Sequence, residues 1–186
     1  NLKLYNNKIH KYDLFFALSH GVHRGSLKKG KTDNREFFLN KLIKFSNEIR
    51  FNFFGINDNQ PIWAENFKKE LSKSKMALNL SQGEPLKFYS SDRISQLIGN
   101  GILTFIDIKT NLNKIFKNDE AVFYKNINDL SKKIIKYKNS DKLRAKIAKK
   151  GMIKYHKHMN SVKVSSYMIN KTFKTKEKES FIWEGK

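Results

Sequence analysis

The segment 76–107 (MALNLSQGEPLKFYSSDRISQLIGNGILTFID) places the strongest constraint on the fold of this chain. Residues 76–80 form an apolar run typical of a buried strand, and Gly83 interrupts the pattern shortly after it. Residues 90–92 (SSD) offer side chains that can cap a short helix, which an Asn-Gly pair ends. Residues 102–106 again have the pattern of a strand.

The order strand, loop, helix, turn, strand is a βαβ unit, and such units build parallel sheets. In an open parallel sheet, ligands bind beyond the carboxyl ends of the strands and against helix N-termini. In this chain that place is the loop 81–91. We therefore look first in this loop for residues that could bind a ligand.

The rest of the chain repeats the alternation of strand and helix. Apolar runs predict five strands, each followed by a helical pattern, at 12–18, 49–54, 76–80, 102–106 and 121–124. The first run (YDLFFAL) is apolar almost throughout, which is typical of a strand buried on both faces. The repeat predicts an α/β fold with a doubly wound parallel sheet.

Several details of the helices can be tested directly. A helix over 34–45 should bury one face, formed by Phe37, Phe38, Leu42 and Phe45. A longer helix over 141–158 should be interrupted or kinked near Gly151. Asn160, a good N-cap, should begin a last helix that ends near residue 173.

The chain is long enough for one domain with appended helices. Residues 1–11 are polar and follow no initiating Met, and we interpret them as a linker from a missing N-terminal part. Residues 12–173 form the predicted domain, and 174–186 form a charged tail. Within this tail, Phe181 and Trp183 are expected to dock on another surface.

The formal net charge of +21 requires either an anionic partner or a bias in composition. Only five of the basic residues are arginines, and the remaining lysines are spread along the chain. A protein that reads nucleic acid usually clusters its basic residues and uses arginine for base contacts. We therefore interpret most lysines as solvated surface charge and do not expect nucleic acid as a partner. Peripheral contact with an anionic membrane is compatible with this charge.

Several classes of chemistry are not expected. The sequence contains no cysteine, which excludes disulfides and thiolate chemistry and fits a reducing compartment. No apolar run approaches the ~18 residues of a transmembrane helix, so we expect a cytoplasmic protein, with any membrane contact at the inner face. The histidines form no metal-ligand pattern, and GxSxG is absent, so neither a metal site nor a nucleophilic serine is expected.

Candidate binding residues lie in two segments. The loop 19–34 is rich in glycine and basic residues, which can bring N–H groups and cations to a phosphate, although it lacks Walker A spacing. Further along the chain, Glu84 could meet a ligand hydroxyl, while Lys87 and Arg93 could pair with a diphosphate. Gln96 could donate or accept a hydrogen bond to a sugar hydroxyl. Each candidate has an ordinary alternative as an exposed surface residue.

Four strings carry a resemblance: EPLKFYSSDRISQLIGNGILTFID (84–107), LNKIF (112–116), AVFYKNINDLSKKIIKY (121–137) and LRAKIAKKGMIKYHKHMNS (143–161). Together they resemble the C-terminal half of GT-B glycosyltransferases, above all the glycosyl transferases group 1 set, which includes spore-maturation-protein-like enzymes. The resemblance covers 12–169 and is strongest over 84–151. It implies a Rossmann-like domain, followed by C-terminal helices, that binds a nucleotide-sugar donor.

The resemblance also implies donor-binding residues. Arg24 lies in the loop that corresponds to the family's first strand–helix loop, which approaches the donor phosphates. Lys87 and Arg93 correspond to basic residues that face the diphosphate. Further donor contacts are expected from Tyr89, Ser90 and Asp92, although Ser90 is also explained as a helix cap.

Position 96 departs from the family's pattern. Gln96 stands where the family's helix usually has a Glu that contacts the donor, so hydrogen bonding is kept and charge is lost. We expect donor binding to survive this change but no acid or base role at Gln96. Glu84 remains a candidate contact to the donor. No catalytic residue is assigned, because the family's acceptor site and usual base lie on the N-terminal domain.

The implied reaction of the intact protein is transfer of a sugar from a nucleoside-diphosphate donor to a hydroxyl of a glycan, lipid or protein acceptor. The nucleotide sugar is a substrate, and neither a metal nor another cofactor is implied. One alternative is a basic protein that binds nucleic acid or another polyanion without catalysis, recognised by steeply salt-dependent binding. A second is a nucleotide-binding regulator that does not turn over its ligand.

Overall fold

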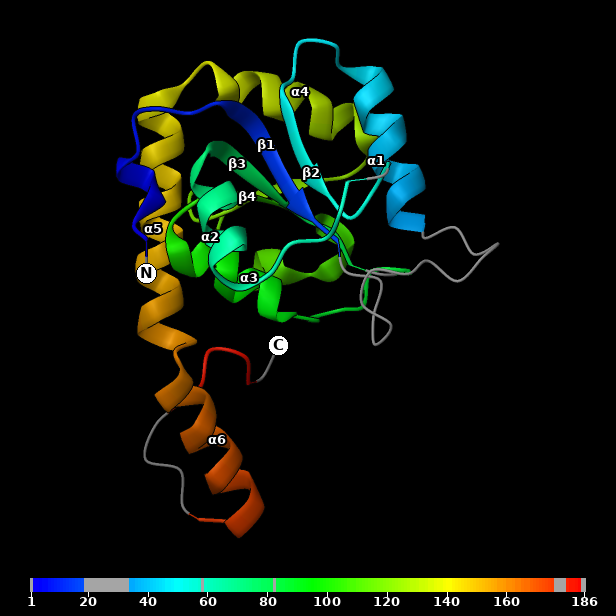
Figure 1. Cartoon of the computed structure of the whole chain (residues 1–186). Coiled ribbons are helices and arrows are strands. Elements are labelled where there is room, and N and C mark those ends of the chain that lie inside the picture. Colours follow the sequence, from blue (N-terminus) through cyan, green and yellow to red (C-terminus); the bar gives the residue numbers. More distant parts are fainter. Residues whose placement is uncertain (1, 19–33, 58, 82, 176–179, 185–186) are drawn as a thin grey trace.

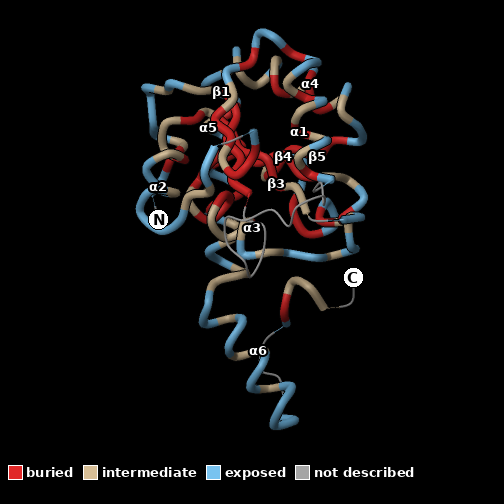
Figure 2. The backbone as a smooth tube through the Cα atoms, turned by 45° about the vertical axis from the view of Figure 1, so that its right-hand side comes forward, coloured by how far each residue is buried: buried red, intermediate tan, exposed pale blue. Residues whose placement is uncertain are grey.

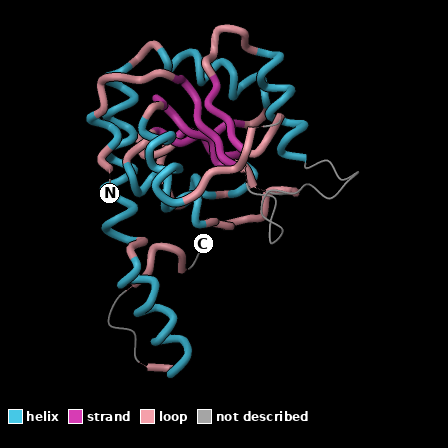
Figure 3. Tube along the Cα trace, viewed as in Figure 1, coloured by secondary structure: helices cyan, strands magenta, loops and turns pink. Residues whose placement is uncertain are grey.

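The computed structural model describes residues 2–18, 34–57, 59–81, 83–175 and 180–184. Its centre is one sheet of five parallel strands in the order β2-β1-β3-β4-β5 (Figure 1, Figure 3). The strands are β1 (Tyr12–Ala17), β2 (Phe51–Phe54), β3 (Ser74–Asn79), β4 (Leu103–Asp107) and β5 (Val122–Tyr124). All five predicted strands are present, and the predicted parallel α/β sheet is confirmed.

Helices cover both faces of this sheet, as a doubly wound fold requires (Figure 1). One face packs against α1 (Asn34–Phe45) and α4 (Ile127–Lys138), joined by part of α5 (Asp141–His158). The other face packs against α2 (Ala64–Ser72) and α3 (Asp92–Leu97). The last helix, α6 (Ser161–Phe173), projects away from the sheet. Short 3-10 helices cover Leu4–Asn6, Ile98–Asn100, Ile108–Thr110 and Leu112–Lys114.

The central strands are buried on both faces, because alternate residues of a strand point to opposite sides. In β1, Leu14 and Phe16 belong to the core beneath α1 and α4, while Phe15 and Ala17 belong to the core beneath α2. Figure 2 shows the buried residues concentrated in these strands. The interpretation of the run 12–18 as a doubly buried strand is confirmed.

Helix α1 has the predicted bounds, but only part of its predicted face is buried. Leu39 and Leu42 are fully buried, whereas the Phe37 side chain is 72% exposed and that of Phe45 is 51% exposed. The buried stripe runs through Arg35, Leu39 and Leu42, which are three or four residues apart. The prediction is confirmed for Leu42 and for Phe38, which packs partly buried against the core, and it was wrong for Phe37 and Phe45, which lie outside the stripe.

Helix α5 is continuous through Gly151, so the predicted interruption was wrong. This glycine lies where the helix meets the segment before β5. A Cβ atom at position 151 would lie 2.1 Å from the carbonyl oxygen of Glu120. Gly151 therefore permits a close approach between backbones rather than a break in the helix.

Helix α6 begins as predicted, since the Asn160 side chain accepts a hydrogen bond from the backbone N–H of Lys163 at 3.0 Å. It has no buried residue. The Tyr167 ring contacts the rings of Phe181 and Trp183, with centroids 5.0 and 5.5 Å away. Phe181 and Trp183 therefore dock on α6, and Phe181 is buried.

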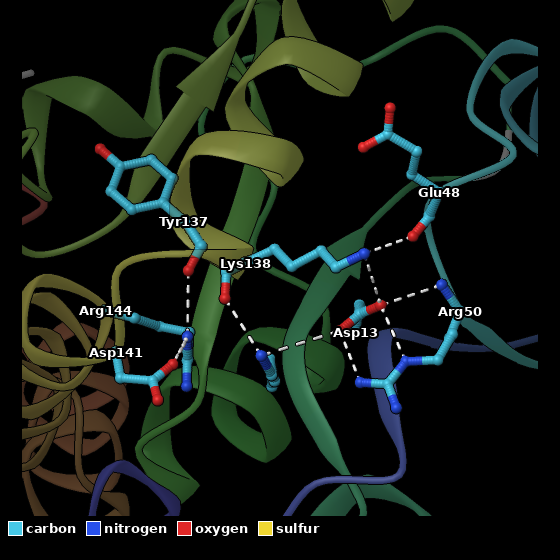
Figure 4. A network of polar contacts seen from close by, with 8 residues as sticks. Asp13, Glu48, Arg50, Tyr137, Lys138, Asp141 and Arg144 are labelled. Carbon is cyan, nitrogen blue, oxygen red and sulfur yellow. Dashed lines mark hydrogen bonds and ion pairs between the residues drawn. The ribbon is translucent and has the colours of Figure 1, made fainter.

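A buried carboxylate connects β1, β3, the segment before β2 and the end of α4 at the amino ends of the strands (Figure 4). Asp13 of β1 has no exposed surface. Arg50, directly before β2, donates to it from Nη2 at 3.0 Å, from Nε at 3.2 Å and from its backbone N–H at 3.0 Å. The ammonium groups of Lys138 and Lys75 lie 3.5 and 4.0 Å from its oxygens.

These contacts determine the ionisation of Asp13. Burial by itself raises the pKa of this carboxyl group, but the hydrogen bonds from Arg50 and the charge of Lys138 outweigh it and hold the pKa below its usual range. Lys138 also donates to the carbonyl of Glu48, and Lys75 donates to the carbonyl of Lys138 at 3.1 Å. The network thus connects β1, β3, the segment before β2 and the end of α4.

Replacing the carboxylate (Asp13→Asn) should lower the free energy of unfolding at pH 7 by about 3 kcal/mol, because the surrounding cations lose their counter-charge. Urea denaturation followed by circular dichroism measures this change. The pKa of Asp13 is lower in the folded chain than in the unfolded one, so its contribution is present above about pH 4 and is lost as pH falls through the folded pKa. The stability of Asp13→Asn should therefore fall less steeply on acidification.

A matched control is Glu65→Gln, which breaks the Glu65–Lys68 pair on the surface of α2. Because the Glu65 side chain is 85% exposed, we expect a change within about 0.5 kcal/mol. Equal losses in the two variants, or parallel acid profiles for Asp13→Asn and the wild type, would contradict the role given to Asp13.

Adding a methyl group at the close approach in α5 (Gly151→Ala) should destabilise the fold by about 1–3 kcal/mol through overpacking against Glu120, although alanine is the better helix former. Thermal denaturation measures the change. The control Lys146→Ala alters an exposed position of the same helix and should stay within about 0.5 kcal/mol. A stabilised Gly151→Ala variant would show that the two segments can separate freely.

Candidate functional site

The strand order places a crevice between β1 and β3. The chain builds the sheet outwards from β1 in both directions, with β2 on one side and β3, β4 and β5 on the other. At such a reversal, the loops that leave neighbouring strands diverge and open a crevice at the carboxyl ends. Ala17 and Leu80 lie at this point, and α3 begins above it.

Arg93, the second residue of α3, bridges the crevice. Its Nη1 donates to the carbonyl oxygen of Leu80 at 2.8 Å, and its Nη2 donates to that of Ala17 at 3.5 Å. The guanidinium also lies over the ring of Phe16, 4.9 Å from its centroid. One side chain thus contacts the ends of both strands that border the crevice.

Arg93 is a partly buried cation whose pKa is influenced by neighbouring groups in both directions. Burial lowers the pKa of its guanidinium, and the charge of Arg35 lowers it further, while Asp92 and Tyr89 oppose the shift. The group remains protonated, because the ordinary pKa of arginine is above about 12. A partly desolvated cation favours the approach of an anion.

Asp92 and Gln96 lie together beside Arg93. The Nε2 of Gln96 donates to Oδ2 of Asp92 at 3.2 Å, one helical turn away. All three residues line a cavity of about 140 Å³. Its opposite wall comes from α2 and the segment before it, and includes Trp63, Phe67 and Ile62. The structure therefore brings together three of the eight residues predicted from the sequence.

The other predicted residues are placed differently. Glu84 lines a second cavity, of about 400 Å³, on the other side of the loop that follows β3. Lys87, Tyr89 and Ser90 are exposed and line neither of these two cavities. Arg24, with the whole glycine-rich basic loop, lies outside the described residues.

The start of α3 lacks the side-chain cap that the polar residues 90–92 predicted. Ser91, not Ser90, takes the N-cap position, with extended backbone angles, but its side chain makes no capping hydrogen bond. The preceding loop is held instead by Phe88. Its N–H donates to the carbonyl of Thr110 at 2.7 Å, and its ring packs against the core around Ile94 and Ile106.

Sequence reasoning missed Asp107 and Tyr124, which also line the larger cavity. They end β4 and β5, and they are partners in the register of these strands. A signal was present in the sequence, because both residues follow apolar runs at the carboxyl ends of predicted strands. The alternation of side chains could not be assigned to a face without the register.

Among the described residues, no group of three or more His, Asp or Glu side chains could hold a metal ion. No helix within the described part of the chain is long and apolar enough to cross a membrane.

The strand order and the helices on both faces define a doubly wound, Rossmann-like α/β protein. A family model described as glycosyl transferase-like matches residues 31–170. The chain therefore belongs to the glycosyl transferase-like family, and the resemblance stated from the sequence is confirmed. No curated protein sequence matches the chain.

Solved structures agree with this fold. The crystal structure of TarM aligns with a TM-score of 0.60 at 13% identity, covering 88% of this chain and 35% of TarM. Sucrose-phosphate synthase from Thermosynechococcus elongatus aligns with a TM-score of 0.55 at 15% identity, covering 81% of this chain and 37% of that protein. The present chain thus spans about a third of the length of either neighbour, and at these identities the likeness concerns the fold.

Replacing the bridging arginine by lysine (Arg93→Lys) keeps the charge but removes the planar fork that reaches two carbonyls. We expect the free energy of unfolding to fall by about 1–3 kcal/mol, because Leu80 and Ala17 lose a donor. Urea denaturation measures this loss. Lys87→Ala, an exposed position nearby, should stay within about 0.5 kcal/mol. A stability of Arg93→Lys equal to that of the wild type would show that the bridge is dispensable.

Proposed function

We propose that this chain is the donor-binding part of a glycosyltransferase. In this proposal the crevice between β1 and β3 binds a nucleoside-diphosphate sugar. Joined to a further, N-terminal domain, the protein would transfer the sugar to a hydroxyl of a glycan, lipid or protein acceptor. Membership of the glycosyl transferase-like family supports the reaction class, and the position of Arg93 supports the place of binding.

The single observation that carries the proposal is Arg93 at the reversal of strand order. Its hydrogen bonds to Leu80 and Ala17 use two N–H groups, and a guanidinium has five. The remaining donors are suited to phosphate oxygens, which arginine binds in a planar, bidentate manner. In the reaction, such a cation would stabilise the negative charge of the departing nucleoside diphosphate.

The neighbouring side chains have compatible roles. Asp92 and Gln96 present an acceptor and an amide to the smaller cavity, where hydroxyls of the nucleoside could bind. Glutamine at position 96 fits its surroundings, since its amide donates to Asp92, whereas a glutamate would place two carboxylates together. Lys87, Tyr89 and Ser90, on the exposed loop before α3, and Arg24 remain candidates for contacts with the bound donor.

The proposal predicts that one nucleoside diphosphate stabilises this chain. Thermal denaturation in moderate salt with UDP, GDP or ADP, each alone and as a nucleotide sugar, identifies the base. At a ligand concentration of about 100 Kd, the gain should be about 2.7 kcal/mol. For a chain of this size, that gain corresponds to a midpoint rise of roughly 5–10 °C. Arg93→Ala should abolish the rise, whereas Lys146→Ala, an exposed change on α5, should retain it.

Opposite results would separate the alternatives. If no nucleotide shifts the midpoint while duplex DNA or heparin binds with steep dependence on salt, the proposal fails and the net charge of +21 is the better guide to function. If a nucleotide binds equally well to Arg93→Ala and the wild type, the crevice between β1 and β3 is not the binding place.

A further inference from the structure

The larger cavity, of about 400 Å³, lies at the carboxyl ends of β3, β4 and β5, on the side of the sheet covered by α1 and α4. Leu80, Asp107 and Tyr124 reach it from these three neighbouring strands. The register pairs Asp107 with Tyr124, so their side chains leave the sheet on the same face. A volume of this size lies within the range of small-molecule sites.

Tyr124 is the most informative residue of this cavity. Its side chain is 1% exposed, and its hydroxyl has no hydrogen-bond partner among the described residues. The Phe38 ring of α1 lies against it, with centroids 6.3 Å apart. A buried hydroxyl without a partner is unfavourable, and native proteins contain few of them. A ligand group in the cavity would provide the missing partner.

Asp107 provides an acceptor beside this hydroxyl. One carboxylate oxygen accepts the backbone N–H of Lys109 at 2.9 Å, which orients the group. Burial raises the pKa of Asp107, the hydrogen bond from Lys109 opposes this, and the charge of Glu84 adds to the rise. Burial also raises the pKa of Tyr124, so its hydroxyl stays protonated and can donate as well as accept.

The rest of the lining combines an apolar wall with cations. The Phe37 side chain is 72% exposed although it lines this cavity, and Pro85 adds a second apolar surface. Lys41, Lys109 and Lys125 also line it and are exposed. Carboxylate and hydroxyl groups beside an aromatic wall suit a polyhydroxylated ring, and the lysines suit a phosphate attached to such a ring.

The cavity adjoins the crevice through a single residue. The carbonyl of Leu80 accepts the hydrogen bond from Arg93, while Leu80 also lines the larger cavity. A diphosphate held at Arg93 would therefore have the larger cavity on the other side of Leu80. The lining of the larger cavity suits a polyhydroxylated ring with an attached phosphate, which is the chemistry of a sugar joined to a diphosphate at Arg93.

We propose that this cavity binds the sugar ring of the donor, and that the Tyr124 hydroxyl and the Asp107 carboxylate select the sugar by hydrogen bonding to its hydroxyls. This inference rests on the proposed function. Tyr124 and Asp107 are then specificity-determining residues, and the nucleotide part of the donor does not contact them. A donor whose sugar lacks the hydroxyl facing Tyr124 should bind more weakly.

The test compares Tyr124→Phe with the wild type by isothermal titration calorimetry. The titrants are the nucleoside diphosphate that stabilises the wild type and the corresponding nucleotide sugars. Affinity for the nucleotide alone should be unchanged in Tyr124→Phe, whereas affinity for the preferred nucleotide sugar should fall about 3- to 10-fold, as expected for one neutral hydrogen bond. Asp107→Asn should show a larger loss, about 10-fold or more.

The design separates a binding role from a structural one. Because the Tyr124 hydroxyl has no hydrogen-bond partner in the part of the chain that the structure describes, Tyr124→Phe should leave the thermal midpoint of the free chain unchanged or raise it. Tyr137→Phe is the matched control, since the Tyr137 ring packs against Phe105 and does not line this cavity. It should bind both ligands as the wild type does.

Two outcomes would overturn the inference in distinguishable ways. If the wild type binds the nucleotide but Tyr124→Phe and Asp107→Asn keep full affinity for the nucleotide sugar, the sugar does not occupy this cavity, while the proposed donor site stands. If the wild type binds neither nucleotide nor nucleotide sugar, the proposed function and this inference both fail.

Discussion

The ion-pair network around Asp13 is the interaction on which the arrangement of the sheet depends. A carboxylate with no exposed surface is unfavourable unless cations and hydrogen bonds compensate it, and here Arg50, Lys75 and Lys138 do so. These cations come from the segment before β2, from β3 and from the end of α4. The network therefore holds β1 between its two neighbours at one end and holds α4 across the same end. The network stabilises the order in which β1 lies between β2 and β3.

The two ends of the sheet use positive charge differently. At the amino ends, the cations Arg50, Lys75 and Lys138 are held around the buried carboxylate of Asp13. At the carboxyl ends, the hydrogen-bond partners of Arg93 among the described residues are two backbone carbonyls, which carry no net charge. The guanidinium thus keeps its attraction for an anion while its position is fixed. This contrast explains why the proposed phosphate site lies at Arg93, although basic residues occur throughout the chain.

Local sequence patterns predicted the helices and strands better than they predicted which faces of these elements are buried and which residues they contact. The five strands, the bounds of α1 and the Asn160 cap follow from apolar runs and turn residues, which act over a few positions. The buried face of α1 followed only in part, because Phe37 and Phe45 lie outside the stripe that contacts the sheet. The role of Gly151 was also ambiguous in the sequence, because glycine occurs both where a helix breaks and where two backbones approach each other closely. Of the candidate site, Asp92, Arg93 and Gln96 were predictable from their place at a helix start, whereas Asp107 and Tyr124 required the register of β4 and β5.

The sequence by itself determined the class of the fold and the family, because hydrophobic periodicity and the family's motifs are properties of neighbouring positions. It also determined that the segment after β3 would lie at the carboxyl end of a parallel strand. Only the tertiary structure decided which side chains meet there. Arg93 reaches Ala17 across 76 positions of the chain, and Tyr124 becomes the neighbour of Asp107 through strand pairing. Such contacts depend on strand order and register, which are set by packing of the whole domain and cannot be read from any local stretch.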